Sequence, residues 1–261
     1  MSLKIEKVNF SYRDKKVLND ISFEVQKGRL ACLLGANGVG KSTLFKNILK
    51  LLPDYQGEIR IDSVNTKKLG IKEMARLVAY IPQSHMPAFN FNVFDMVLMG
   101  TTIKTSPISK PGKKQQELVE QMLEKLGIAE LKYRGFNQIS GGERQLTLIA
   151  RALVQEAKIL LMDEPTANLD YGNQVKILNQ MKALTEEGYT IIQSTHQPDQ
   201  AFLYADEVVA MQNGCVLRQG SPREVIESDT IKQLYGIEVD IHSIYQDRMR
   251  VCIPTSVIAR L

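Results

Sequence analysis

The stretch GANGVGKSTL, from Gly35 to Leu44, decides the fold of this chain. It matches the pattern G-x-x-x-x-G-K-[ST], whose glycines let backbone N–H groups converge on phosphate oxygens. The apolar run RLACLLG leads into it and predicts a strand buried on both faces. The segment KSTLFKNILKLL follows with helical spacing, and Pro53 predicts the end of that helix. A strand, this loop and a helix in succession predict a site for the phosphates of a nucleotide.

Two side chains of this loop have specific chemistry. Lys41 is expected to reach the β- and γ-phosphates, and the hydroxyl of Ser42 is expected to bind Mg²⁺. A glycine-rich turn that merely precedes a helix is the alternative, and the flanking strand and helix argue against it. The residues predicted to hold the nucleotide here are Gly35, Asn37, Gly38, Gly40, Lys41, Ser42 and Thr43.

Composition and charge exclude several classes of protein. The chain has 261 residues, 44% of them hydrophobic, so it can bury a substantial core. Its formal net charge of +4 is too small to predict a nucleic-acid partner. The three cysteines (Cys32, Cys215 and Cys252) fit no metal-binding spacing and favour a reduced, intracellular protein. Because no apolar run reaches the ~18–20 residues that span a bilayer, we expect any work at a membrane to need a partner.

Strands and helices alternate along most of the chain, which predicts an α/β fold with a mostly parallel sheet. The N-terminal segments LKIEKVNFSY and ISFEVQKG predict antiparallel strands, with RDKKVLND as their connection. Residues 86–158 predict a mainly helical insert. ADEVVAMQNGCVLRQG predicts a hairpin that turns at Asn213–Gly214. We therefore expect one domain with a core of residues 1–85 and 159–220, the helical insert at 86–158, and a C-terminal helix and short β tail at 221–261.

The apolar segment ILLMDEP ends on two adjacent carboxylates, Asp163 and Glu164. Adjacent residues at the end of a strand point in different directions, so the two acids can do different work. Asp163 fits a position on the Mg²⁺ side of the site, and Glu164 fits a general base that polarises the attacking water. An acidic strand end or helix cap is the structural alternative. A glutamate directly after this aspartate favours hydrolysis over transfer to another substrate.

The stretch ISGGERQ, from Ile139 to Gln145, predicts a second anion site, because a Ser-Gly-Gly turn opens a helix there. The alternative is a Ser140 N-cap with glycines for a tight entry into the helix. Its position upstream of LLMDEP favours the anion site. Only one G-x-x-x-x-G-K-[ST] loop occurs in the chain, so this helix start is a further phosphate-binding feature.

Together these motifs resemble the ATP-binding subunit of ATP-binding cassette (ABC) transporters. The matching order spans almost the whole chain and runs Tyr12, GANGVGKST, Gln83 in IPQ, SGGE, LLMDEP, NLD and His196 in STH. The resemblance implies a P-loop NTPase core with an antiparallel β-subdomain and a helical signature subdomain. It also implies that two copies sandwich two ATP molecules head to tail. Each ATP would then lie between one copy's P-loop and the other copy's Ser140, Gly141 and Gly142.

The resemblance also implies roles for four further residues. Tyr12 would stack on adenine, and Gln83 would touch Mg²⁺ or the lytic water and sense a membrane partner. His196 would contact the γ-phosphate, and Asp170 would cross the dimer interface. Each has a structural alternative: ordinary packing for Tyr12, a plain loop position for Gln83, a structural role for His196 and a helix N-cap for Asp170. The family's commonest signature has Gln where this chain has Glu143, which leaves the backbone donors in place.

The segment after Gln83 resembles the importers of metal chelates, such as iron–siderophore, haem and cobalamin systems and related oxyanion systems. Val93, Asp95 and Val97 fit that pattern, whereas Thr101 stands where arginine is usual. The implied protein is an ATP-hydrolysing subunit at the cytoplasmic face of the membrane. Its partners would be a second copy, an integral membrane permease dimer and, indirectly, a substrate-binding protein. A soluble ABC ATPase, such as an iron–sulfur cluster assembly ATPase, is the alternative.

Overall fold

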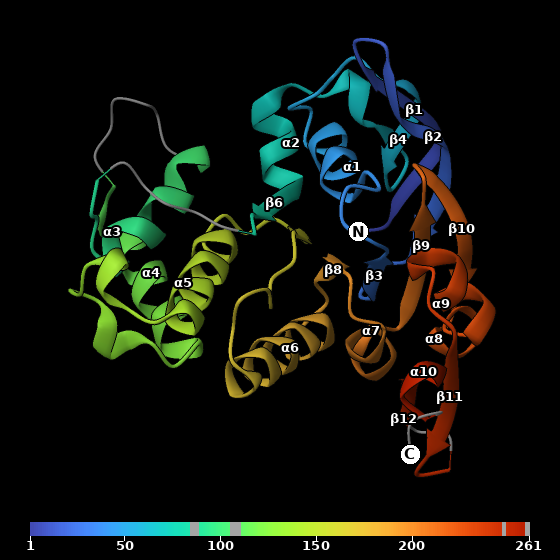
Figure 1. The fold of residues 1–261 in the computed structure, drawn as a ribbon. Helices are drawn as coiled ribbons and strands as arrows, with labels where there is room; N and C mark the ends of the chain where they lie inside the picture. The colour runs from blue at the N-terminus through green and yellow to red at the C-terminus, as the bar shows by residue number, and fades with distance from the viewer. Residues whose placement is uncertain (84–88, 105–110, 247–248, 259–261) are drawn as a thin grey trace.

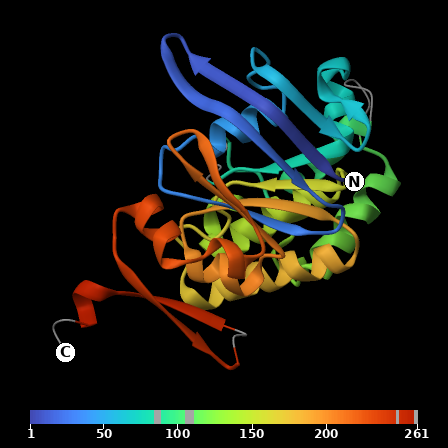
Figure 2. The same ribbon diagram turned by 90° about the vertical axis from the view of Figure 1, so that its right-hand side faces the viewer.

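The computed structural model describes residues 1–83, 89–104, 111–246 and 249–258. Two sheets, one mostly parallel and one antiparallel, form the larger part of the molecule, and a group of helices lies beside them (Figure 1). A small hairpin, followed by a short helix, lies at the edge of the molecule toward the C-terminus (Figure 2). The α/β class predicted from the sequence is confirmed.

The central sheet has six strands in the order β10-β9-β3-β8-β7-β6. All neighbouring pairs are parallel except β9 and β10, which form the predicted hairpin at Asn213–Gly214. Both turn residues have positive φ, which suits a two-residue hairpin loop. The strand β6, like helix α2 before it, was not predicted. The strands are β3 (Leu30–Leu34), β6 (Val78–Ile81), β7 (Ile159–Met162), β8 (Thr190–Thr195), β9 (Glu207–Gln212) and β10 (Cys215–Gly220).

Strand β3 is buried on both faces, as its apolar run predicted. Ala31 and Leu33 face a core shared with the antiparallel sheet, and Cys32 and Leu34 face a core shared with the C-terminal helices. This two-sided burial is typical of a central parallel strand. It holds the end of β3, where the glycine-rich loop begins, in a rigid position.

The antiparallel sheet has the order β2-β1-β4-β5. The predicted connection between the first two strands was wrong, because β2 already begins at Lys15 and pairs there with Tyr12. Arg13, with φ of 51°, allows a tight turn that leaves no room for a longer loop. Leu18, predicted to lie in that connection, is a fully buried strand residue. The strands are β1 (Leu3–Tyr12), β2 (Lys15–Val25), β4 (Gln56–Ile61) and β5 (Val64–Asn65).

Four helices accompany the sheets. The helix after the glycine-rich loop ends at Ile48 rather than near Pro53, which corrects the prediction. Lys50 takes a left-handed conformation (φ of 59°), and the buried Asn47 side chain donates to the carbonyl of Leu52 at 2.7 Å. These contacts stop the helix one turn early. The helices are α1 (Lys41–Ile48), α2 (Ile71–Leu77), α6 (Tyr171–Glu186) and α7 (Pro198–Tyr204).

In the described residues between β6 and β7, three α-helices form the predicted helical region (Figure 1). Gly127, with φ of 65°, follows the end of α4. These helices share one hydrophobic core with β6 and β7, which includes Phe136, Ile149 and Leu160. Residues 86–88 and 105–110 of the predicted insert lie outside the described residues, and its boundaries stay a prediction. The helices are α3 (Val93–Leu98), α4 (Lys113–Lys125) and α5 (Gly141–Leu153).

The C-terminal segment packs against the end of the central sheet through Val225, Ile231 and Leu234. Its hairpin of β11 and β12 contacts α7. In the described part of the chain, no helix has the length and apolar character needed to cross a membrane. The elements of this segment are α8 (Pro222–Val225), α9 (Ser228–Tyr235), β11 (Val239–Ile244), β12 (Met249–Pro254) and α10 (Thr255–Ile258).

Candidate active site

The predicted site residues meet at one edge of the central sheet. Gly35 follows β3, Gln83 follows β6, Asp163 follows β7 and His196 follows β8. These four strands are adjacent and parallel, so their carboxyl ends lie at the same edge. Open α/β sheets bind ligands at this edge.

The glycine-rich loop needs its glycines for two reasons. Gly38 and Gly40 have φ of 83° and 108°, a region that side chains rarely tolerate. A Cβ on Gly35 would lie 2.4 Å from the carbonyl oxygen of Met211, and one on Gly40 would lie 2.8 Å from Leu18. The loop is therefore wedged between β9 and β2, and its backbone N–H groups are available for an anion.

Lys41 begins α1 and is only 5% exposed. Its Nζ donates to the carbonyl oxygens of Gly35 at 2.7 Å and Ala36 at 3.0 Å. Burial lowers the pKa of Lys41, while the carboxylates of Glu164 and Asp163 oppose that shift. A phosphate at the loop would add negative charge beside this amine and stabilise its charged form.

A cavity of about 240 Å³ lies over the loop. Every residue that lines it was predicted from the sequence as a nucleotide-binding or catalytic residue. Its polar lining suits a charged ligand. The lining residues are Asn37, Gly38, Gly40, Lys41, Ser42, Thr43, Gln83 and Glu164.

Glu164 is the centre of a polar cluster at this cavity. Its Oε2 accepts from Nε2 of Gln83 at 3.2 Å and lies 3.5 Å from Nδ1 of His196. Its Oε1 lies 3.9 Å from Nζ of Lys41. The predicted base is therefore close to three other predicted site residues: Gln83 after β6, His196 after β8 and Lys41 at the start of α1.

The backbone of Glu164 has φ of 46°, an uncommon conformation for a residue with a Cβ. The hydroxyl of Ser194 supports it, accepting from the N–H of Glu164 at 2.9 Å and donating to Oδ1 of Asp163 at 2.6 Å. Tyr80 donates to Oδ2 of Asp163 at 3.2 Å. Sequence reasoning missed Ser194 and Tyr80, although a serine inside an apolar strand is a usable signal.

Asp163 is nearly buried, with 6% exposure, and does not line the cavity. Both of its oxygens are occupied by the hydroxyl donors of Ser194 and Tyr80. The acid thus lies behind Glu164, where it adds negative charge to the site. This arrangement is consistent with the prediction that the two adjacent acids point in different directions, and their separate roles stay a prediction.

Ser140 is the N-cap of α5, as the structural alternative proposed. Its Oγ accepts from the N–H of Glu143 at 3.3 Å, and Oε2 of Glu143 accepts from the N–H of Ser140 at 2.7 Å. This reciprocal capping box lowers the pKa of the Glu143 carboxyl. Glu143 therefore has a local structural function that the family's usual glutamine would also serve, and the N–H groups of Gly141 and Gly142 remain at the helix start.

The start of α5 packs against the start of α6. A Cβ on Gly142 would lie 2.3 Å from Oδ1 of Asn173, so a side chain there would clash. Asp170 caps α6, and its carboxylate accepts from the N–H of Asn173 at 2.9 Å and from Nδ2 of Asn173 at 2.6 Å. The N-cap, which was the structural alternative for Asp170, is confirmed, and its place at a dimer interface stays a prediction. Neither helix start lines the cavity over Lys41 among the described residues.

Tyr12 ends β1 and is 43% exposed. Its ring packs edge-on against Phe10, with 4.9 Å between ring centroids. Tyr12 does not line the cavity over the loop. Packing against Phe10 matches the structural alternative and leaves part of the ring accessible to a ligand.

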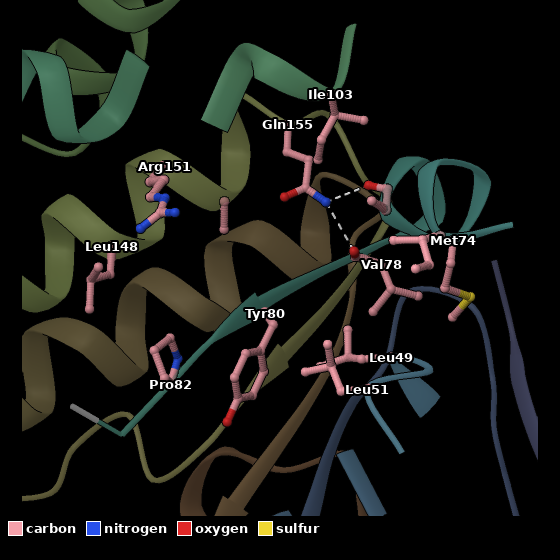
Figure 3. A pocket seen from close by; sticks show the side chains of 13 residues that line it. Leu49, Leu51, Met74, Val78, Tyr80, Pro82, Ile103, Leu148, Arg151 and Gln155 are labelled. Atoms are coloured by element: carbon pink, nitrogen blue, oxygen red, sulfur yellow. Dashed lines mark hydrogen bonds between the residues drawn. The ribbon is translucent and has the colours of Figure 1, made fainter. Parts of the chain in front are cut away.

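An apolar groove of about 370 Å³ lies between α1, α2 and β6 on one side and α5 on the other (Figure 3). Gln155 is directed toward α2 and β6, and its amide donates to the carbonyl oxygens of Ala75 and Val78. Pro82 lines the groove and is the chain neighbour of Gln83. Sequence reasoning missed this groove. The other lining residues are Leu49, Leu51, Ile71, Met74, Tyr80, Ile103, Leu148, Arg151 and Ala152.

The glycine-rich loop, its buried lysine and the acids at neighbouring strand ends define a P-loop nucleotide-binding protein. The chain belongs to the ABC transporter family, whose sequence profile matches residues 18–167. The family's ATP-binding proteins are ATPases, and this chain is accordingly an ATPase whose hydrolysis of ATP is coupled to transport.

Known proteins are similar along almost the whole chain. An ABC transporter ATP-binding protein of Haemophilus influenzae is 38% identical over 90% of this chain and 89% of its own length. The hemin import ATP-binding protein of Shewanella denitrificans is 35% identical over 92% and 96%. A structure assigned to the metal-chelate type of ABC transporter, in an inward-facing conformation, superposes with a TM-score of 0.86 at 28% identity and covers 98% of each chain. The comparisons do not support an iron–sulfur cluster assembly ATPase.

Proposed function

We propose that this chain is the energy-coupling subunit of a metal-chelate importer and that two copies share each ATP. One observation carries the shared site: the start of α5, with Ser140, Gly141 and Gly142, does not line the cavity over Lys41. Exposed Ser140 leaves a helix N-terminus available to an anion from another molecule. A head-to-tail dimer would bring this helix start to the partner's nucleotide.

In this proposal the cavity holds the triphosphate. The backbone of Gly38 and Gly40 and the amine of Lys41 would bind the β- and γ-phosphates. Glu164 would accept a proton from the attacking water, which makes it the general base. His196, 3.5 Å from that carboxylate, would contact the γ-phosphate and align the water. Tyr12 would stack on the adenine with its accessible ring.

The oxygen donors at the site suit Mg²⁺, which prefers hard ligands and keeps several waters. The Ser42 hydroxyl and the Gln83 amide line the same cavity and would supply side-chain oxygens. Asp163, held by Ser194 and Tyr80, would add the negative charge that favours a divalent cation. When bound, the cation would neutralise charge on the β- and γ-phosphate oxygens.

Subunit mixing tests the shared site. In a homodimer of the Lys41→Ala variant, both sites lack the loop lysine. In a homodimer of the Ser140→Arg variant, both sites lack an intact helix start. A heterodimer of the two has one intact site, made from the loop of the Ser140→Arg copy and the helix start of the Lys41→Ala copy. In a 1:1 mixture about half of the dimers are heterodimers, and each of these has one of its two sites intact, so mixing the two inactive variants should restore up to about a quarter of the wild-type ATPase rate. No recovery in a mixture whose heterodimers are verified would argue against the head-to-tail arrangement.

The apolar groove beside Gln83 is our proposed docking site for a cytoplasmic segment of a membrane permease. Leu51 and Ile71 line it and are 62% and 75% exposed, which is costly unless a partner covers them. Pro82 links the groove directly to Gln83 and hence to Glu164. Docking would thereby connect permease movement to the hydrolytic cluster, and ATP-driven closure and reopening of the dimer would be the bistable step.

The cargo class rests on the similar proteins that carry hemin or belong to the metal-chelate type. The permease, a second copy of this chain and a substrate-binding protein would complete the importer at the cytoplasmic face of the membrane. Deleting the gene should abolish uptake of a ⁵⁵Fe-labelled chelate while uptake of an amino acid continues. Normal uptake of every ferric siderophore, hemin and cobalamin offered would refute the cargo class without affecting the ATPase assignment.

A further inference from the structure

The turn that presents His196 is held mainly through its backbone. Thr195 ends β8, and its carbonyl oxygen accepts from the N–H of Gly35 at 3.3 Å. The hydroxyl of Thr195 accepts from the N–H of Gln197 at 3.1 Å. The imidazole of His196 is 41% exposed, and its Nδ1 lies 3.5 Å from Oε2 of Glu164. The position of this side chain therefore depends on how its peptide units are held.

A residue from the C-terminal segment contacts this turn. The phenol of Tyr235 donates to the carbonyl oxygen of His196 at 3.1 Å. Tyr235 is the last residue of α9, which ends at Gly236 with φ of 71°. Burial raises the pKa of Tyr235, and the nearby Glu164 carboxylate adds to the rise, so the phenol stays protonated and remains a donor at neutral pH.

The same segment also holds the helix that follows His196. The N–H of Cys252 in β12 donates to Oδ1 of Asp199 at 3.4 Å, near the start of α7. The guanidinium of Arg250 lies over the ring of Phe202, 5.6 Å from its centroid. Figure 1 shows α9 and the β11–β12 hairpin on the same side of the molecule as α7. The turn is thus held by the P-loop on one side and by the C-terminal segment on the other.

We propose that Tyr235 is a positioning residue for His196, so that the C-terminal segment takes part in ATP hydrolysis. The inference rests on the proposed role of His196 at the γ-phosphate. A fixed His196 carbonyl sets the plane of the peptide bond that follows it and, with it, the direction of the imidazole. Displacements of about 1 Å in a catalytic group cost large factors in rate, so a single hydrogen bond to this peptide matters.

Tyr235→Phe in the full chain removes the hydroxyl and keeps the ring. We expect kcat for ATP hydrolysis to fall about three- to tenfold, which corresponds to the loss of one neutral hydrogen bond. The KM for ATP should stay within about twofold, because Tyr235 itself does not line the nucleotide cavity. Tyr245→Phe is the matched control: Tyr245 belongs to the same C-terminal segment and is 76% exposed, and its replacement should change neither kcat nor KM.

A double-mutant cycle separates positioning from general stabilisation. In a His196→Ala background, where no imidazole remains to be placed, Tyr235→Phe should change single-turnover phosphate release by less than about 1.5-fold. An equal fold-loss in both backgrounds, or an unchanged kcat in Tyr235→Phe, would overturn the proposal. A wild-type rate in His196→Ala alone would instead refute the proposed role of His196.

Discussion

Replacing Glu164 by glutamine tests the assignment of the general base. The change removes the charge and keeps the shape of a side chain that contacts Gln83 at 3.2 Å and His196 at 3.5 Å. General-base catalysis contributes about 10²- to 10⁴-fold to a rate. At about 1.4 kcal/mol per decade, the barrier to hydrolysis should rise by about 3–5 kcal/mol.

The same change should leave ATP binding intact or make it tighter. Nζ of Lys41 lies 3.9 Å from Oε1 of Glu164, and both side chains are mostly buried, at 5% and 11% exposure. At an effective dielectric constant of about 20, the Coulomb attraction between the two side chains is about 4 kcal/mol. This value is an upper bound on how strongly the Glu164 carboxylate competes with the ATP phosphates for the amine of Lys41. Removing the carboxylate therefore frees Lys41 for the phosphates.

The assay has two parts: steady-state phosphate release, and equilibrium titration with a fluorescent ATP analogue. Size-exclusion chromatography with ATP should in addition show an accumulated dimer, because hydrolysis no longer reopens it. Glu117→Gln, an exposed change on α4, is the matched control and should behave as wild type. A rate within tenfold of wild type, or loss of ATP binding in Glu164→Gln, would refute the base assignment.

Three further changes address the loop, the signature helix and the groove. Lys41→Ala should weaken ATP binding by about a hundredfold or more, because charged hydrogen bonds to phosphate are lost. Isothermal titration calorimetry measures the affinity for ATP. An unchanged affinity would contradict the contact between Lys41 and the phosphates. Glu143→Gln keeps the capping geometry but loses the charge at the start of α5, at a cost below about 1 kcal/mol in urea unfolding at pH 7. The pKa of Glu143 is lower in the folded chain than in the unfolded chain, where it is 4.5. The wild type's extra free energy of unfolding over Glu143→Gln is therefore complete above pH 4.5 and is lost as the pH falls through the folded pKa. A stability difference that grows in acid would contradict this prediction. Ile71→Asp, at the first position of α2, should keep the isolated subunit's ATPase activity and abolish co-purification with the permease. Retained co-purification would place the docking site elsewhere.

Local features of the fold were predictable because consecutive residues encode them. The buried strand before Gly35, the helix after Lys41 and the turn at Asn213–Gly214 each follow from periodicity, glycine content or turn chemistry. The helix end near Pro53 was not predictable in the same way. A left-handed Lys50, whose amine donates to the carbonyl of Leu69, and an Asn47 that the folded core buries completely end the helix early.

The kinds of chemistry expected at the site were also predictable from the sequence. Phosphate binding at Lys41 and an acid pair at Asp163–Glu164 depend on residue types at fixed short spacing, so a motif is enough to predict them. The contacts that hold Asp163 in place were not predictable from the sequence. Ser194 and Tyr80 hold Asp163 through hydroxyls from two other strands, and no local pattern relates those positions.

The sequence by itself determined that this chain is a P-loop nucleotide-binding protein, and it predicted a second helix start that would bind an anion. Only the tertiary structure decided which of these features meet. The strand order β3-β8-β7-β6 brings the ends of four strands from distant parts of the chain to one edge, and it leaves the start of α5 outside the cavity. The tertiary structure also brings Tyr235, from the C-terminal segment, to the carbonyl of His196, across 39 residues of sequence. The physical reason is that spacing along the chain specifies local conformation, whereas the order of strands in a sheet depends on long-range packing.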